Sequence, residues 1–114
     1  MSETALPLLK GTVDMLVLKA LSWGPMHGFG IALWLEEHSA GTLGLDDSMT
    51  YQVLHRLEGK GHIAAKWRIT ENKRRARFYT LTADGQRYLA DQAMAWQRYS
   101  SSVTGIMSLR TRPA

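Results

Sequence analysis

The feature that most constrains this chain is a short amphipathic helix followed at once by a strongly basic hairpin. The pattern predicts the helix over residues 46–61, and two strands with their connecting tip over residues 62–81. Glu71 is the single acid of the hairpin, and its cations are Lys66, Arg68, Lys73, Arg74, Arg75 and Arg77. Cations gathered at a loop tip repel one another, and a polyanion would offset that repulsion. A helix and a basic hairpin in this order indicate a winged helix-turn-helix, with nucleic acid as the leading partner.

The composition is that of one small globular domain. The chain has 114 residues, of which 45% are hydrophobic, enough for a modest core. A net charge of +4 permits nucleic-acid binding without requiring it, so the clustering of cations matters more than their sum. With no cysteine there is neither a disulfide framework nor a thiolate metal site, and the four histidines lack the spacing of a metal motif. We therefore expect no metal and no cofactor.

The sequence gives no sign of a membrane partner or of secretion. No uninterrupted apolar run approaches the roughly 20 residues that a membrane-spanning helix needs. Residues 1–7 have neither a basic segment nor a long apolar run, so no signal peptide is expected. The expected location is cytoplasmic.

Two helices are predicted before the central one. Residues 8–23 carry an apolar stripe at helical spacing, and Gly24-Pro25 ends that helix because proline cannot continue the backbone ladder. Residues 26–39 form the second helix. Gly28 and Gly30 lie in one turn of it, which indicates either close packing against another element or a frayed helix start. Residues 43–45 are expected to be extended and could pair with the later hairpin.

The central helix has two faces that suggest a division of roles. Met49, Tyr51, Val53, Leu54 and Leu57 recur at spacings of three and four, which predicts the buried side. The expected outward side is polar and suited to base edges and phosphates. Two roles are open for Tyr51. It could contact DNA, or its ring could pack in the core with the hydroxyl at the edge of the core. The residues expected to bind DNA are Ser48, Thr50, Tyr51, Gln52, His55, Arg56, Lys73, Arg74, Arg75 and Arg77.

The strands of the hairpin alternate apolar and polar residues. Ile63, Ala65, Trp67 and Ile69 are expected to point inward from the first strand, and Tyr79 and Leu81 from the second. The basic tip is predicted over residues 70–77.

The last helix is predicted over residues 83–109, after Thr82 as its N-cap. At ~1.5 Å per residue it would be roughly 40 Å long, too long for so small a domain to cover. Its heptad-like apolar spacing predicts a seam with another helix, most simply that of a second copy. Residues 1–81 would then be the DNA-binding domain, and residues 82–114 the dimerisation helix. The expected dimer contacts are Leu8, Leu9, Leu89, Gln92, Trp96, Tyr99, Val103 and Ile106.

Four segments in this order, residues 8–14, 24–31, 51–58 and 72–82, resemble the PadR-type transcriptional regulators, of the short kind with one C-terminal helix. The resemblance covers nearly the whole chain. It implies a regulator, most simply a repressor, that binds a pseudo-palindromic operator as a homodimer. Some members of that family bind flat aromatic or cationic compounds near the dimer interface, which makes Trp96 and Tyr99 candidates for stacking on a small aromatic ligand.

One segment departs from the family pattern. Members usually carry a Gly-Ser-Leu-Tyr-Pro-like run where the third helix starts, and here the run is Ser48-Met49-Thr50-Tyr51-Gln52. Only the tyrosine is retained. Because this turn is where such a helix would enter the groove, the departure bears on the operator sequence more than on the fold.

The sequence also bears on other function classes. An enzyme is not expected, because carboxylates such as Asp14 and Asp46 come without a nucleophile, a metal cluster or a phosphate-binding loop. Two alternatives stay open beside the regulator. The first is a small-molecule sensor with its aromatic site at the dimer interface. The second is an interaction adaptor that uses the long helix and binds no DNA.

Overall fold

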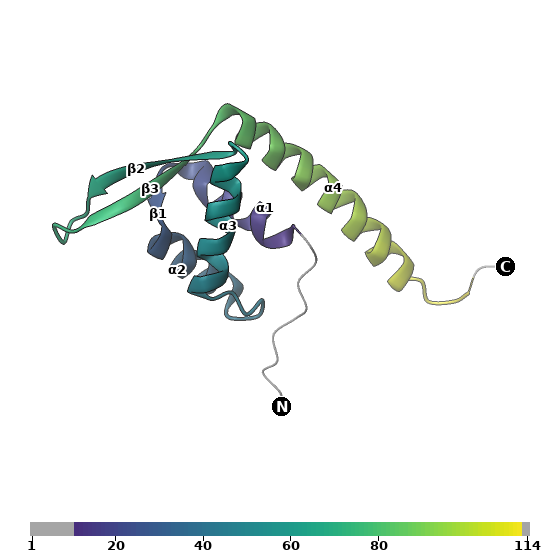
Figure 1. The fold of residues 1–114 in the computed structure, drawn as a ribbon. Coiled ribbons are helices and arrows are strands. Elements are labelled where there is room, and N and C mark those ends of the chain that lie inside the picture. Colours follow the sequence, from purple (N-terminus) through teal and green to yellow (C-terminus); the bar gives the residue numbers. More distant parts are fainter. Residues whose placement is uncertain (1–10, 113–114) are drawn as a thin grey trace.

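The computed structural model describes residues 11–112 of the chain, and Figure 1 shows their arrangement. The helices α1, α2 and α3 pack together. A β-hairpin projects from them on one side, and α4 extends from them on another. The expected mainly helical winged helix-turn-helix is confirmed. In chain order the elements are α1 (Thr12–Ala20), the 3-10 helix η1 (Leu21–Trp23), β1 (Met26–His27), α2 (Gly28–Ser39), α3 (Asp47–Gly59), β2 (Ile63–Ile69), β3 (Arg75–Leu81) and α4 (Ala83–Met107).

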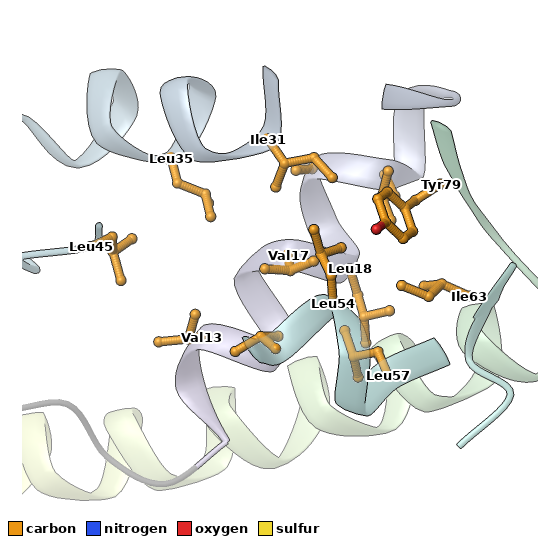
Figure 2. Close-up of a cluster of buried hydrophobic side chains, with 13 residues drawn as sticks. Val13, Val17, Leu18, Ile31, Leu35, Leu45, Leu54, Leu57, Ile63 and Tyr79 are labelled. Carbon is orange, nitrogen blue, oxygen red and sulfur yellow. The ribbon is translucent and has the colours of Figure 1, made fainter. Parts of the chain in front are cut away.

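A single hydrophobic core joins the three helices to the base of the hairpin. Figure 2 shows its side chains converging between α1, α2 and α3, with Ile63 and Tyr79 closing it from the strands. Burial of such side chains stabilises a fold by about 1.5–3 kcal/mol each. Because every element except the outer parts of the hairpin and of α4 contributes to it, this core determines where those two projections begin. Its largest fully buried members include Leu18, Ile31, Leu54 and Leu57.

Side-chain caps begin three of the helices. The Asp46 carboxylate accepts from the Met49 N–H at 2.8 Å, and the Thr82 hydroxyl accepts from the Gly85 N–H at 3.0 Å. Each cap satisfies an N–H group that the first helical turn leaves free, and the Thr82 cap was predicted. The cap of α2 was not predicted. There Nδ1 of His27 accepts from the Gly30 N–H at 2.9 Å.

The third strand of the sheet is not the one expected. β1 pairs antiparallel with β3, with Met26 opposite Tyr79 and His27 opposite Phe78, so the sheet order is β1-β3-β2. The prediction that residues 43–45 could pair with the hairpin is wrong, as is the helical assignment of Met26 and His27. Gly44 has a φ of 61° and donates its N–H to the Gly41 carbonyl, so this segment turns while Leu45 enters the core.

The hairpin reaches further from the core than the alternation predicted. Trp67 and Ile69 were expected to point inward, but their side chains are 55% and 64% exposed. The seven residues of each strand span about 23 Å at ~3.3 Å per residue, which is longer than the core beneath them. Only the inner part of each strand therefore packs on the helices. β2, β3 and the turn between them are called the wing below.

A buried ion pair joins α1 to α3. The Arg56 guanidinium donates to both carboxylate oxygens of Asp14, at 2.5 and 3.2 Å. The Asp14 side chain is 8% exposed and that of Arg56 is 48% exposed. The hydrogen bonds to Asp14 and its charge raise the pKa of Arg56 above its ordinary value. Removal of Arg56 would leave a carboxylate buried without a partner, so Arg56 has a structural role.

The wing and α4 meet at one close contact. Gly85, in the first turn of α4, lies against the carbonyl oxygen of His62 at the start of β2. The Thr82 N–H donates to that same carbonyl at 3.2 Å, and the Thr82 hydroxyl donates to the Gly61 carbonyl at 2.7 Å. The His62 ring also stacks on Tyr88, with 4.2 Å between centroids. These contacts set the direction in which α4 leaves the domain.

This junction gives a test of the fold. A Cβ at position 85 would collide with the His62 carbonyl, so we expect Gly85→Ala to lower the free energy of unfolding by about 1–3 kcal/mol, as overpacking does. Gly105 lies in the same helix with open space around its Cα, so Gly105→Ala should instead raise stability by about 0.5–1 kcal/mol. Urea unfolding followed by circular dichroism measures both. Equal stabilities for the two variants would contradict the contact.

Candidate nucleic-acid interface

One polar stripe of α3 faces solvent. Ser48, Tyr51, Gln52 and His55 are exposed and recur at spacings of three and four, whereas Val53, Leu54 and Leu57 are buried on the opposite side. These four residues are called the α3 stripe below. Hydroxyl, amide and imidazole groups are suited to base edges and phosphates, so the helix offers a row of hydrogen-bonding ends to a partner.

Thr50 is not part of that stripe. It was expected to face outward and bind DNA, but its side chain is 0% exposed. Its hydroxyl donates to the Asp46 carbonyl at 3.1 Å, which satisfies the polar atom within the helix. A buried side chain of this kind does not reach a partner, so the prediction is wrong. The spacing from Thr50 to Val53, Leu54 and Leu57 could have placed it on the apolar side of the helix. A threonine whose hydroxyl bonds to a carbonyl of its own helix packs like a small apolar residue.

Tyr51 departs from its predicted burial in the opposite direction to Thr50. It was assigned to the buried side of the helix, yet it is 46% exposed. Its ring lies against Gly28 at the start of α2, where an added Cβ would collide with it. Gly28 therefore reflects close packing against α3 and makes room for Tyr51, whereas Gly30 lies beside His27, the N-cap of its own helix. One side of the ring packs on the domain, and the rest stays open to solvent as part of the α3 stripe.

Two of the predicted DNA-binding arginines are engaged within the protein. Arg56 holds Asp14, as described above. Arg77 on β3 donates to the Glu58 carboxylate on α3 at 2.7 Å, which ties the wing to the helix. Gln52 and Arg56 also border a hollow of about 560 Å³ between α1, α3 and α4. The sequence showed the charges of both arginines but not these partners, which come from distant parts of the chain.

The tip of the wing is a tight, cationic turn. The Thr70 N–H donates to the Arg74 carbonyl at 2.8 Å, and the Lys73 N–H donates to the Thr70 carbonyl at 2.9 Å. Lys73 has a φ of 59°, a left-handed conformation that is uncommon for lysine. The turn is shorter than the predicted tip, because Arg75 and Arg77 belong to β3. Lys73, Arg74 and Arg75 are exposed, and within residues 11–112 no carboxylate pairs with them.

Aromatic rings hold several wing arginines in place. The Arg75 guanidinium lies 4.8 Å from the centroid of Trp67, and that of Arg68 lies 4.8 Å from the centroid of Phe78. Such stacking limits the freedom of the arginine side chains before any partner arrives. Arg68 was predicted to be a cation of the hairpin but was not among the residues expected to bind DNA, and Trp67 was predicted to point into the core. Alternation between cations and aromatic residues was the signal that could have linked them.

The last helix presents an apolar surface. Leu89 and Gln92 are half-buried near α1, whereas Trp96, Tyr99, Val103 and Ile106 are exposed. Met15, Trp96 and Tyr99 line a shallow groove of about 230 Å³ between α1 and α4, and the rings of Trp96 and Tyr99 are 6.0 Å apart. The other predicted dimer contacts, Leu8 and Leu9, lie outside the described residues.

The described part of the chain has neither a metal-binding cluster nor a membrane-spanning helix. Residues 11–112 contain no group of three or more histidines or carboxylates that could hold a metal ion. Among the same residues, no helix combines the length and the apolar character needed to cross a membrane.

A curated relative is similar to this chain in sequence. The chain is 38% identical over 90 residues to an uncharacterised 37.1 kDa protein in transposon TN4556 of Streptomyces fradiae. That match covers 79% of this chain and 24% of the relative, so the chain spans about a quarter of the length of the curated relative it matches.

Three solved structures are similar in fold. A Streptococcus mutans protein has a TM-score of 0.82 at 22% identity, covering 97% of this chain and 100% of its own. A PadR-like transcriptional regulator from Bacillus cereus has a TM-score of 0.79 at 19% identity, with coverages of 90% and 97%. A PadR family transcriptional regulator from Eggerthella lenta has a TM-score of 0.74 at 26% identity, with coverages of 89% and 86%.

The family model of the transcriptional regulator PadR-like family matches residues 17–91, from the middle of α1 to the third turn of α4. This range includes the α3 stripe and the whole wing. The chain therefore belongs to the PadR-like family of transcriptional regulators.

Proposed function

We propose that this chain binds double-stranded DNA in the cytoplasm as a homodimeric transcriptional repressor, with the α3 stripe in the major groove and the wing beside it. The observation that carries the proposal is the combination of an exposed polar stripe on α3 with exposed cations on the wing, which directly follows α3 in the chain. The Arg77–Glu58 ion pair ties the two elements together. An α-helix fits the major groove, and duplex DNA supplies the negative charge that the wing lacks.

The α3 stripe and the wing have different chemistry, so they have different tasks in this proposal. Gln52 and Ser48 carry uncharged donors and acceptors, which discriminate between base pairs in the major groove. Lys73, Arg74 and Arg75 carry flexible charges, which attract phosphates of any sequence. The stripe would therefore determine which DNA is bound, and the wing how tightly.

The apolar surface of α4 supports the proposed homodimer. Trp96, Tyr99, Val103 and Ile106 leave a large apolar area open on one helix, and a second copy of α4 would cover it. Residues 1–81 would then bind DNA, and residues 82–114 would hold the dimer, helped by Leu8 and Leu9. Two α3 helices related by a two-fold axis would enter successive major grooves roughly 34 Å apart, which fits a pseudo-palindromic operator. A dimer seated over two grooves of a promoter would exclude other proteins, which favours repression.

A sensor function is the second candidate, and one observation favours it. The groove of about 230 Å³ beside Trp96 and Tyr99 presents two exposed rings to a flat aromatic ligand. A ligand there would lie next to the proposed dimer seam and would change the spacing of the two α3 helices. In that case, DNA affinity would depend on the ligand.

The first test concerns the wing. We expect the double variant Arg74→Ala and Arg75→Ala to weaken binding to every duplex and to flatten the log–log salt dependence by up to about 1.8 units, at ~0.9 per lost phosphate contact. Fluorescence anisotropy over a salt series measures both effects. The matched control removes Arg98 and Arg110, which are exposed beyond the wing. Equal slopes for the two double variants would count against phosphate contacts by the wing.

The second test concerns the α3 stripe. Ser48→Ala and Gln52→Ala should change which sequences the protein selects from a random pool of duplexes, because both side chains are exposed on the stripe. Thr50→Ser is the control, since it keeps the internal hydroxyl bond of a buried residue. Sequencing of the selected DNA gives the motif for each protein. If Gln52→Ala and wild type select the same motif, α3 is not the reader.

The third test concerns the dimer. Val103→Asp places a charge in the apolar surface of α4 and should shift the protein toward monomer, with weaker operator binding and an intact wing. Sedimentation equilibrium at micromolar concentration compares it with wild type. Thr104→Asp, one position along the same helix and outside the predicted seam, is the matched control. A Val103→Asp variant that stays fully dimeric would place the dimer contact elsewhere.

A further inference from the structure

The wing carries two apolar side chains that the core does not use. Trp67 and Ile69 are 55% and 64% exposed, although both belong to β2. They are called the wing strip below. The core is already closed at the base of the same strand by Ile63, which is 2% exposed. Large exposed apolar side chains on a projecting hairpin favour aggregation, so their presence points to a partner that covers them.

The register shows which way the wing strip faces. Ile63, Trp67 and Ile69 lie at alternate positions of β2, so they share one face of the hairpin. Opposite Trp67 on β3 is Arg77, whose guanidinium bonds to Glu58 on α3. The wing strip is therefore on the α3 side of the hairpin. A duplex with the α3 stripe in its major groove would meet this face of the wing at the neighbouring minor groove.

Cations flank the wing strip on the neighbouring strand. Ile69 lies opposite Arg75, and Trp67 lies opposite Arg77. The Arg75 guanidinium is 4.8 Å from the Trp67 ring centroid, and that of Arg77 is 6.0 Å from it. This combination of apolar and cationic groups is complementary to a surface with apolar walls and a negative potential. Duplex DNA offers such a surface in its minor groove, between the sugars of the two strands.

We propose that Ile69 and Trp67 enter the minor groove together with Arg75 and make the wing selective for A·T over G·C base pairs. The inference rests on the proposed DNA-binding function and adds a second, minor-groove reader to it. At A·T pairs the floor of the groove presents only the acceptors adenine N3 and thymine O2, which match the guanidinium of Arg75. A G·C pair adds the 2-amino group of guanine, a donor that an apolar side chain would bury without an acceptor.

Inosine separates this proposal from major-groove reading. Inosine is guanine without its 2-amino group, so an I·C pair keeps the major-groove edge of G·C and presents a minor groove like that of A·T. The experiment uses two duplexes of one mixed sequence and one length, the second with inosine in place of every guanine. Wild-type protein should bind the inosine duplex roughly fivefold tighter or more, the discrimination that one contacted base pair supplies. Fluorescence anisotropy at fixed salt gives both affinities.

Two variants and one control attribute the preference to the wing strip. Ile69→Ser and Trp67→Ala alter exposed side chains and keep every wing cation in the chain, although Trp67→Ala removes the ring on which Arg75 stacks, so both should still bind DNA. Each should lower the ratio between the two duplexes toward one. Trp23→Ala removes another exposed tryptophan, 68% exposed on η1, and should keep the wild-type ratio.

The outcomes distinguish this inference from the proposed function. Wild-type protein that binds both duplexes equally well would overturn minor-groove selectivity and leave DNA binding intact. A preference for inosine that survives in Ile69→Ser and in Trp67→Ala would assign the selectivity to other residues. If wild-type protein binds neither duplex at low salt, the proposed function itself fails.

Discussion

The close contact between Gly85 and the His62 carbonyl is the constraint on which the arrangement of this protein depends. The chain passes this point twice, once as α3 gives way to β2 and again as β3 gives way to α4. Hydrogen bonds from Thr82 to the Gly61 and His62 carbonyls hold the two passages together. Because the core ends here, the wing and α4 leave the domain in directions that this junction determines. A DNA-binding dimer would need both directions, since one places the wing beside α3 and the other sets the distance between the two α3 helices.

Positive charge has two roles in this structure. Arg56 and Arg77 are ion-paired to Asp14 and Glu58, and they connect α3 to α1 and to the wing. Lys73, Arg74 and Arg75 are exposed at the outer end of the wing, where they repel one another. Replacing a cation of the first group removes an ion pair of the fold, whereas replacing one of the second leaves those ion pairs intact. This distinction underlies the choice of Arg74 and Arg75, rather than Arg56 or Arg77, as probes of DNA affinity.

Much of the fold could be predicted because local rules were sufficient. Asp46 and Thr82 are caps that act within one helical turn, and Gly24-Pro25 stops a helix whatever surrounds it. The candidate site was predicted less well. The predicted burial of Thr50 and Tyr51 was reversed. Thr50 is buried because its hydroxyl is satisfied internally, and Tyr51 is partly exposed on Gly28, which leaves room for its ring. Trp67 and Ile69 were placed in the core because alternation along a strand shows which residues share a face but not where the core beneath it ends.

The sequence by itself determined the order of the four helices and of β2 and β3, the caps of α3 and α4, the position of the basic turn and the apolar surface along α4. Each of these depends on residues within one turn of helix, on alternation along one strand or on the type of side chain. Only the tertiary structure decided which strand pairs with β3, that Thr50 rather than Tyr51 is buried on α3, how far the wing projects and which arginines are bound internally. Each of these depends on where a second element lies, and the partners Asp14 and Arg56, separated by 42 positions, meet only when the core has formed.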